Sequence, residues 1–346
     1  MTGRPTPGAA RWMAALAVIA SIATAGCGAA AGLKHSADSG PPPGPLSPVS
    51  DYLAAVRVAH HDHLTVWIET DLVRRWEAGP AAFRAGVRRA AFLASQPGVA
   101  GIKVADELGY NDGMDSPAKI RRFLSVTAHA LRAAAPHTRI LVDMVVPQLG
   151  CLPGQRPAMP GAAACMSRAE ASYPQLALPK IDAYLRMHAI DVLDLSSGLL
   201  SPGTYSSWGT SIDAAQAAAW REAARRGWPR LVLLQSRKAL AHPGSYRSTP
   251  AQTQADLHTF VDIPLASGAH AVDVWTWHQQ YDGAMYSLMN PGMQPNTLWA
   301  GLVQRRRAHD VLFTHMSPHS LESGLRPDLA KIATVFTAVF LPAGTG

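Results

Sequence analysis

Acidic side chains recur close to the ends of short apolar segments of this chain. The segment at 101–107 (GIKVADE) contains Lys103 and ends in Asp106 and Glu107. Charged groups are costly inside a strand unless they are paired or reach solvent. Carboxyl groups that converge at strand ends can donate and accept protons, so these residues are candidates for general acid–base chemistry. Lys103 has two alternative interpretations. It forms a structural ion pair, or it is a catalytic lysine that forms a Schiff base.

Other acids and large planar side chains occupy neighbouring segments and extend this candidate site. Tryptophan faces can stack on a pyranose ring, while two carboxyl groups serve as acid and as base or nucleophile. The combination predicts a saccharide site. The predicted catalytic residues are Glu69, Glu107, Asp143 and Asp194. The predicted ligand-binding residues are Trp67, Asp106, Gln235, Trp275, Trp277 and His278.

The elements that must position these residues alternate between strand and helix. The strand candidates are short, rich in Val, Ile and Leu, and bounded by Gly, Pro or polar residues. They lie at 64–70, 101–107, 139–145, 189–196, 230–236 and 271–277. Helical stretches lie between them, and several begin with Ser or Thr followed by a proline or an acid. Repeated β-then-α units imply a parallel sheet covered by crossover helices.

The two faces of each predicted strand differ. One face is aliphatic, and the other carries most of the acids and tryptophans, with Asp71 and Asp273 among them. An open sheet covered on both faces should be apolar on both, whereas the inner face of a barrel becomes polar toward the carboxyl ends of its strands. We therefore predict an α/β fold with a (β/α)8 TIM-like barrel, complete or irregular, over an open doubly wound parallel sheet. In this register Glu107 and Lys103 point inward, and Asp106 leans outward or into the following loop.

The spacing of the carboxyl groups bears on mechanism. Neighbouring strands lie about 4.8 Å apart. Glu107 and an acid on an adjacent strand would suit a retaining pair at about 5–5.5 Å, and Asp194, two strands away, would suit the wider inverting geometry. The sequence is compatible with both the retaining and the inverting geometry.

The pattern resembles the large clan of barrel glycoside hydrolases over residues 64–283. Members of that clan have an acid/base glutamate at the end of the fourth strand, a nucleophilic glutamate at the end of the seventh and a tryptophan on the eighth. The resemblance implies that VADE ends the fourth strand, VLLQ the seventh and VWTW the eighth. Asp106 then replaces the usual asparagine, and Gln235 replaces the nucleophile. If 64–70 is instead the first strand, the missing strands follow residue 283, where 332–340 is the candidate.

The amino terminus has the pattern of an export signal. A basic start with Arg4 and Arg11 precedes an apolar run at 12–25 that is too short to span a membrane comfortably. The ending TAGC resembles the lipobox of bacterial lipoproteins, which implies lipidation of Cys27; an ordinary secretory signal is the alternative. We predict a signal peptide at 1–26, a Pro/Ser/Gly-rich tether at 27–50 and one barrel domain at 51–346, exported and lipid-anchored to the outer face of the cell membrane or secreted.

The two other cysteines, Cys151 and Cys165, are predicted to form a disulfide outside the reducing cytosol. The net charge of +7 is spread over predicted helices, so nucleic acid is not an expected partner. The HHDH motif at 60–63 precedes its strand and would lie at the wrong end of a barrel for a metal site. We expect neither a metal nor an organic cofactor.

Two functions of different classes follow. The first is an exported barrel enzyme that acts on a glycan or glycoconjugate, with Glu107 as general acid, Asp143 or Glu69 as its partner, and Trp275 and Trp277 as the sugar platform. The second is a non-catalytic surface lipoprotein that binds saccharide in the same cleft. The expected partners are a carbohydrate ligand and, through the lipid, a membrane.

Overall fold

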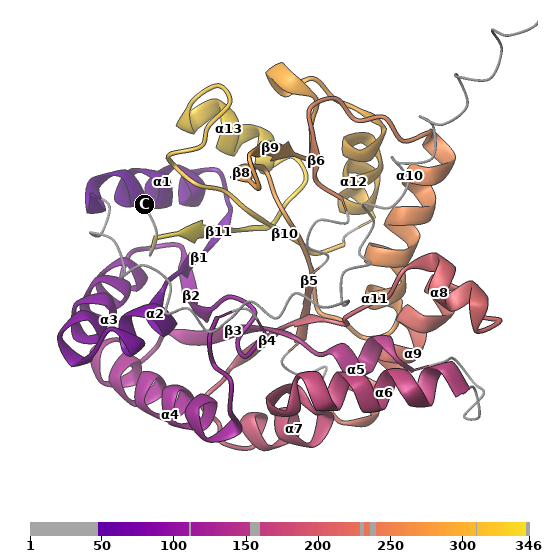
Figure 1. The fold of residues 1–346 in the computed structure, drawn as a ribbon. Coiled ribbons are helices and arrows are strands. Elements are labelled where there is room, and N and C mark those ends of the chain that lie inside the picture. Colours follow the sequence, from indigo (N-terminus) through magenta and orange to yellow (C-terminus); the bar gives the residue numbers. More distant parts are fainter. Residues whose placement is uncertain are drawn as a thin grey trace, which may run out of the picture.

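A computed structural model describes residues 48–110, 112–152, 160–228, 232–235, 240–308 and 310–343. Within these residues eight parallel strands form a closed barrel (Figure 1). They are β1 (Thr65–Glu69), β2 (Val99–Ala105), β3 (Arg139–Val145), β4 (Val192–Ser196), β5 (Val232–Gln235), β7 (Val272–Val274), β10 (Leu312–His315) and β11 (Ala338–Pro342). The first and last of these strands pair along their whole length, which closes the barrel. The predicted α/β barrel is therefore confirmed, and the open sheet is wrong.

The strand positions implied by the glycoside hydrolase resemblance are wrong. VADE, VLLQ and VWTW belong to the second, fifth and sixth barrel strands and the residues after them, not to the fourth, seventh and eighth. The reason is that 64–70 contains the first barrel strand, and two further barrel strands follow residue 283. One of these, β11, overlaps the predicted 332–340 segment, and the other, β10, was not predicted. The fourth barrel strand ends at Ser196 and the seventh at His315, so neither ends in glutamate.

Helices surround the barrel on its outer side (Figure 1). The described α-helices are α1 (Val49–His61), α2 (Leu72–Glu77), α3 (Pro80–Ala94), α4 (Pro117–Ala134), α5 (Pro147–Gly150), α6 (Pro160–Ser172), α7 (Leu178–Leu185), α8 (Pro202–Ser207), α9 (Ile212–Arg225), α10 (Pro250–Leu257), α11 (Ile263–Ala266), α12 (Thr297–Arg307) and α13 (Leu325–Ile332). Side-chain caps explain several starts. Ser116, Ser211 and Thr249 each accept a hydrogen bond from the backbone N–H three residues later, as the Ser/Thr pattern predicts.

The two faces of the barrel strands bury different kinds of side chain, as the alternation predicts. Outward-facing residues such as Val66, Ile102 and Val142 belong to a large apolar core shared with the helices. A second, small apolar cluster consists of Trp67, Leu141, Val192, Ala271, Ala338 and Phe340, which alternate with the outward set. The inner face is therefore apolar at one level of the barrel and charged at the next.

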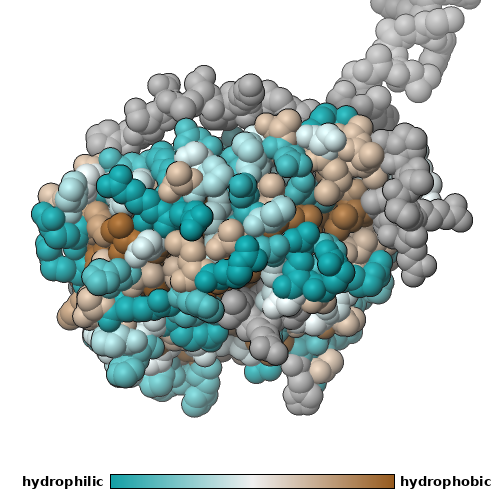
Figure 2. Space-filling view, turned by 90° about the horizontal axis from the view of Figure 1, so that it is seen from below, coloured by the Kyte–Doolittle hydropathy of each residue, from teal (hydrophilic) through white to brown (hydrophobic). Residues whose placement is uncertain are grey.

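The predicted disulfide between Cys151 and Cys165 is present, with Cα atoms 5.5 Å apart. It joins the end of α5 to α6, directly after β3. One face of the molecule, shown in Figure 2, is mainly hydrophilic, with apolar residues in small separate areas. Among the described residues, no helix combines the length and the apolar character needed to cross a bilayer. Residues 1–47, including Cys27 and most of the predicted tether, lie outside the described part.

A small antiparallel sheet stands beside the barrel. It consists of β6 (His242–Pro243), β9 (Ala284–Ser287) and β8 (His278–Tyr281), in that order. The hairpin of β8 and β9 follows the sixth barrel strand, β7, after three residues. It therefore begins at the carboxyl end of the barrel, where (β/α)8 proteins build their sites.

Candidate functional site at the carboxyl end of the barrel

Lys103 lies at the centre of a group of charged side chains inside the barrel. Its side chain is 0% exposed, and its Nζ lies 3.0 Å from Oδ1 of Asp106, 3.5 Å from Oδ2 of Asp143 and 3.9 Å from Oε1 of Glu69. Burial alone would lower the pKa of Lys103, but these carboxylates and that of Asp194 raise the pKa well above its ordinary value. The amine is therefore held as an ammonium ion. This favours the structural ion pair over the Schiff-base lysine.

Strand register explains why these groups meet. Glu69 lies opposite Lys103 in the pair of β1 and β2, and Asp143 lies opposite Asp194 in the pair of β3 and β4. The pairing of β2 with β3 shifts between Lys103 and Ala105, and such an irregularity redirects the side chains that follow it. Asp106 lies in the loop after β2, one of the two positions predicted for it, and its side chain turns toward Lys103.

His315, at the end of β10, joins two carboxylates across the barrel. Its Nδ1 lies 2.9 Å from Oε2 of Glu69, and its Nε2 lies 2.8 Å from Oδ2 of Asp273. Burial alone would lower the pKa of His315, but Asp273 and Glu69 raise it to about 9. The imidazole is therefore protonated at neutral pH and donates from both nitrogens. His315 was not predicted because its strand was not predicted; the available signal was the apolar run VLF directly before Thr314 and His315.

The two cations in turn keep buried carboxyl groups ionised. Burial alone would raise the pKa of Glu69, but Lys103 and His315 hold it below its ordinary value. His315 has the same effect on Asp273, whose pKa is lowered against the opposing effect of burial. The two cations thus hold ionised carboxylates inside the barrel.

Two carboxylates of this group reach solvent. The side chain of Asp106 is 42% exposed and that of Glu69 is 16% exposed, whereas those of Asp143 and Asp273 are fully buried. The exposed pair contacts the same nitrogen of Lys103 at 3.0 and 3.9 Å, so these two oxygens are at most about 7 Å apart. Carboxyl pairs that cleave glycosidic bonds are separated by about 5–5.5 Å or about 6.5–9.5 Å. The upper limit on the distance between these two oxygens is therefore compatible with the retaining separation and with the shortest inverting separations.

An aromatic floor separates the charged group from the apolar cluster inside the barrel. The ring of Phe340 lies 5.2 Å from Nζ of Lys103 and 4.8 Å from the ring of His315. Trp67, predicted as a ligand-binding residue, packs on the other side, with its ring centroid 6.5 Å from that of Phe340 and only 2% of its surface exposed. Trp67 is therefore part of the barrel core in this structure. Access to the charges comes from the carboxyl end.

Glu107, the predicted general acid, follows Asp106 in a turn after β2. Its φ of +53° lies in the left-handed region, and its side chain is half-buried. Its charge acts on Tyr110, whose pKa is raised first by burial, then by Tyr173, and also by Glu107. Tyr110 and Tyr173 stack with ring centroids 4.7 Å apart. Glu107 thus lies next to this tyrosine pair and is not among the carboxylates that dominate the environment of Lys103.

The predicted aromatic platform divides into a core residue and a residue at the mouth. Trp277 is 1% exposed, donates from Nε1 to Asp328 and packs against Trp299, so its faces are covered. Trp275 is buried beneath Tyr281 and Tyr286 of the hairpin. The peptide bond between Trp275 and Thr276 is cis. Trp275 therefore packs against the hairpin, whereas Trp277 belongs to the core between the barrel and the helices.

His278 and Gln235 are the remaining predicted ligand-binding residues. His278 is half-buried, with Nδ1 3.2 Å from Oε2 of Glu322. Gln235 ends β5 opposite Asp273, and its side chain lies outside the described part. No group of three or more His, Cys, Asp or Glu residues in the described ranges could hold a metal ion.

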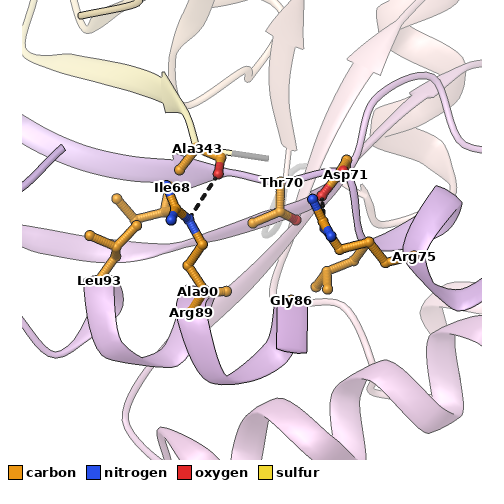
Figure 3. Close-up of a pocket in the computed structure, with 10 residues that line it drawn as sticks. Ile68, Thr70, Asp71, Arg75, Gly86, Arg89, Ala90, Leu93 and Ala343 are labelled. Atoms are coloured by element: carbon orange, nitrogen blue, oxygen red, sulfur yellow. Dashed lines mark hydrogen bonds and ion pairs between the residues drawn. The ribbon is translucent and has the colours of Figure 1, made fainter. Parts of the chain in front are cut away.

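Asp71, expected on the inner face, lies outside the barrel. It precedes α2 and accepts a 2.6 Å hydrogen bond from Nε of Arg75, as Figure 3 shows. The two residues line a cavity of about 10 Å³ together with Arg89, whose Nε donates to the carbonyl oxygen of Ala343. A space of that size admits one water molecule and no sugar. This cavity belongs to the packing of α2 and α3 on β1, and the alternation fails here because β1 has already ended at Glu69.

Comparisons with known proteins identify no family for this chain. No family model and no curated protein matches the chain. A complete multifunctional pyruvate carboxylase from Rhizobium etli is similar with a TM-score of 0.42 and 12% identity over 87% of this chain and 25% of that one. SrfJ from Salmonella typhimurium is similar with a TM-score of 0.43 and 8% identity over 80% of this chain and 64% of that one. The chain thus spans less than two thirds of either structure, and neither likeness bears on function.

Proposed function

We propose that the protein is an exported, lipid-anchored barrel enzyme that acts on a glycan or glycoconjugate of the cell envelope by carboxylate acid–base chemistry. The observation that carries the proposal is the convergence of acids from several strands on Lys103 and His315 at the carboxyl end of the barrel, with Glu69 and Asp106 reaching solvent. Export and anchoring rest on the signal-like amino terminus and Cys27.

The charges around each acid suggest its role. Glu69 is kept ionised by Lys103 and His315, which suits a base or nucleophile and not a proton donor. Asp106 and Glu107 are the next two acids at the mouth, and one of them would supply the proton to the leaving group. Asp143, Asp194 and Asp273 are buried and would position Lys103 and His315 without touching substrate.

A second candidate, a non-catalytic saccharide-binding protein, is favoured by one specific observation. The fourth barrel strand carries Asp194 and the seventh ends at His315, where the related hydrolases have their two glutamates. A site that lacks both of these glutamates can bind sugar without cleaving it. The same exposed carboxylates would then accept hydrogen bonds from sugar hydroxyl groups.

The test is the release of reducing ends from a panel of bacterial envelope polysaccharides and peptidoglycan fragments. We expect Glu69→Gln to lower turnover at least about 100-fold, with binding of the same glycan within about threefold of wild type. Asp106→Asn and Glu107→Gln identify the proton donor, since only its removal should abolish the loss of activity on the alkaline side of the pH profile.

Glu77→Gln is the matched control, because Glu77 is a partly exposed carboxylate paired with Lys119 on the helical side of the molecule. It should leave turnover unchanged. If wild-type protein binds a glycan and releases no reducing ends from any of them, the binding function replaces the enzymatic one. If it neither binds nor cleaves any member of the panel, both candidates are wrong.

A further inference from the structure

The hairpin of β8 and β9 presents two faces with different chemistry. Its turn is formed by Asp282 and Gly283, both with positive φ (+50° and +75°), as two-residue hairpin turns require. Residues opposite each other in an antiparallel pair share a face. The register therefore places Gln279, Tyr281, Ala284 and Tyr286 on one face, and His278, Gln280, Met285 and Ser287 on the other.

The first face forms a cluster of three aromatic rings with Trp275. The ring centroid of Trp275 lies 5.5 Å from that of Tyr281 and 5.4 Å from that of Tyr286, and the two tyrosines are 6.0 Å apart. Trp275 is 4% exposed, whereas Tyr281 is 40% exposed. The cluster thus has a buried base, which fixes the rings, and an outer edge open to solvent.

Gln279 adds a hydrogen-bonding group with a fixed orientation. Its Oε1 accepts from Nε1 of Trp275 at 3.1 Å. Because the indole N–H can only donate, the carboxamide oxygen must face it and the amide nitrogen must face away. In the described part of the chain that nitrogen has no hydrogen-bond partner. It is therefore a donor directed away from Trp275, on the face that carries Tyr281.

This face is continuous with the charged site. Trp275 directly follows the last residue of β7 and lies two residues after Asp273 in the chain. Oγ1 of Thr276 and the backbone N–H of Trp277 both donate to the carbonyl oxygen of His315, at 3.1 and 3.0 Å. The hairpin is thereby fixed to the residue that joins Glu69 to Asp273.

We propose that the Gln279–Tyr281–Tyr286 face is a sugar-binding subsite that holds an uncharged pyranose ring of an oligosaccharide whose next units reach Glu69 and Asp106. The pyranose C–H surface would stack on Tyr281, and the amide nitrogen of Gln279 would donate to a ring hydroxyl group. An exposed aromatic ring combined with one oriented amide donor matches a neutral sugar, which offers an apolar face and hydroxyl acceptors. This inference rests on the proposed saccharide function and extends it to residues outside the barrel.

Binding of cellohexaose, maltohexaose and hexa-N-acetylchitohexaose, measured by calorimetry, tests the proposal. Tyr281→Ala should weaken binding of the preferred hexasaccharide about three- to tenfold. Gln279→Glu keeps an acceptor for Trp275 and removes the amide donor, and should weaken binding about two- to tenfold. Met285→Ala is the matched control, because Met285 is 39% exposed on the opposite face of the same hairpin, and it should change binding less than twofold.

Thermal unfolding of each variant shows whether the hairpin is intact. If wild-type protein binds a hexasaccharide and folded Tyr281→Ala binds it equally well, this inference is wrong and the proposed function stands. If Met285→Ala weakens binding as much as Tyr281→Ala does, the face assignment is wrong. If wild-type protein binds none of the three hexasaccharides, this inference is wrong, whereas the proposed function is decided separately by the panel of envelope glycans.

Discussion

Lys103 and His315 have structural roles whatever reaction the site performs. Each cation stabilises the ionised form of nearby carboxylates, which burial disfavours. The carboxylates in turn stabilise the charged form of each cation. Removing one partner of such a group leaves the others uncompensated, at a cost of about 3–5 kcal/mol. Loss of activity in a variant of either residue therefore needs a stability measurement beside it. Glu69 and Asp106, which reach solvent, are the better residues with which to test chemistry.

The pH dependence of stability follows from His315. Its pKa in the folded state, about 9, is above the ordinary 6.5 of the unfolded chain, so protonation favours the folded state. The contribution is complete below about pH 6.5 and is lost as the pH rises through 9. We expect the free energy of unfolding, measured with denaturant from pH 6 to 10, to fall by up to about 3 kcal/mol in wild-type protein.

His315→Gln should flatten that decline, since it removes the titrating group. His129→Gln, on the exposed side of α4, should retain it. Equal slopes for wild type and His315→Gln between pH 6.5 and 9 would contradict this account of the site.

At the scale of the elements, alternation along strands predicted which residues share the barrel interior. Lys103, Asp143 and Asp194 could be placed there because the segments that carry them are long, apolar and regular. The direction of the Asp106 side chain could not be predicted, since an irregularity in pairing with β3 redirects it, and pairing partners are not visible in one segment alone. The β10 strand was missed because it has four residues and no alternating pattern of its own. His315 was missed with it.

The barrel interior also depends on one glycine at the start of the charged strand. A Cβ on Gly101 would lie 2.3 Å from the ring of Trp67 and 2.5 Å from the carbonyl oxygen of Arg139, and the second of these is backbone. We expect Gly101→Ala to lower the free energy of unfolding by about 1–3 kcal/mol, because the barrel must expand to admit the methyl group.

Gly203→Ala is the control for this substitution, since a Cβ there meets only Oγ of Ser201 at 3.9 Å. It should change stability by less than about 0.5 kcal/mol in the same denaturant titration. A Gly101→Ala protein as stable as wild type would mean that Trp67 does not fill the barrel floor.

At the scale of the whole molecule, a barrel brings together strands that are distant in sequence. Glu69 on the first strand meets His315 on the seventh, 246 residues later, because β11 closes the ring between them. The fold class could be predicted from the rhythm of strands and helices, since that rhythm is local. The order of strands around the site could not, because it depends on the number of strands in segments that lack a clear pattern. That miscount produced the wrong match to the glycoside hydrolase strand positions.

The most direct test of the account is a crystal structure of the Glu69→Gln protein with the hexasaccharide that binds most tightly. We predict one sugar unit within hydrogen-bonding distance of residue 69 and Asp106, with a neighbouring unit against Tyr281. Electron density for the sugar on the helical side of the barrel, or a Lys103 side chain directed away from the acids of the neighbouring strands, would contradict it.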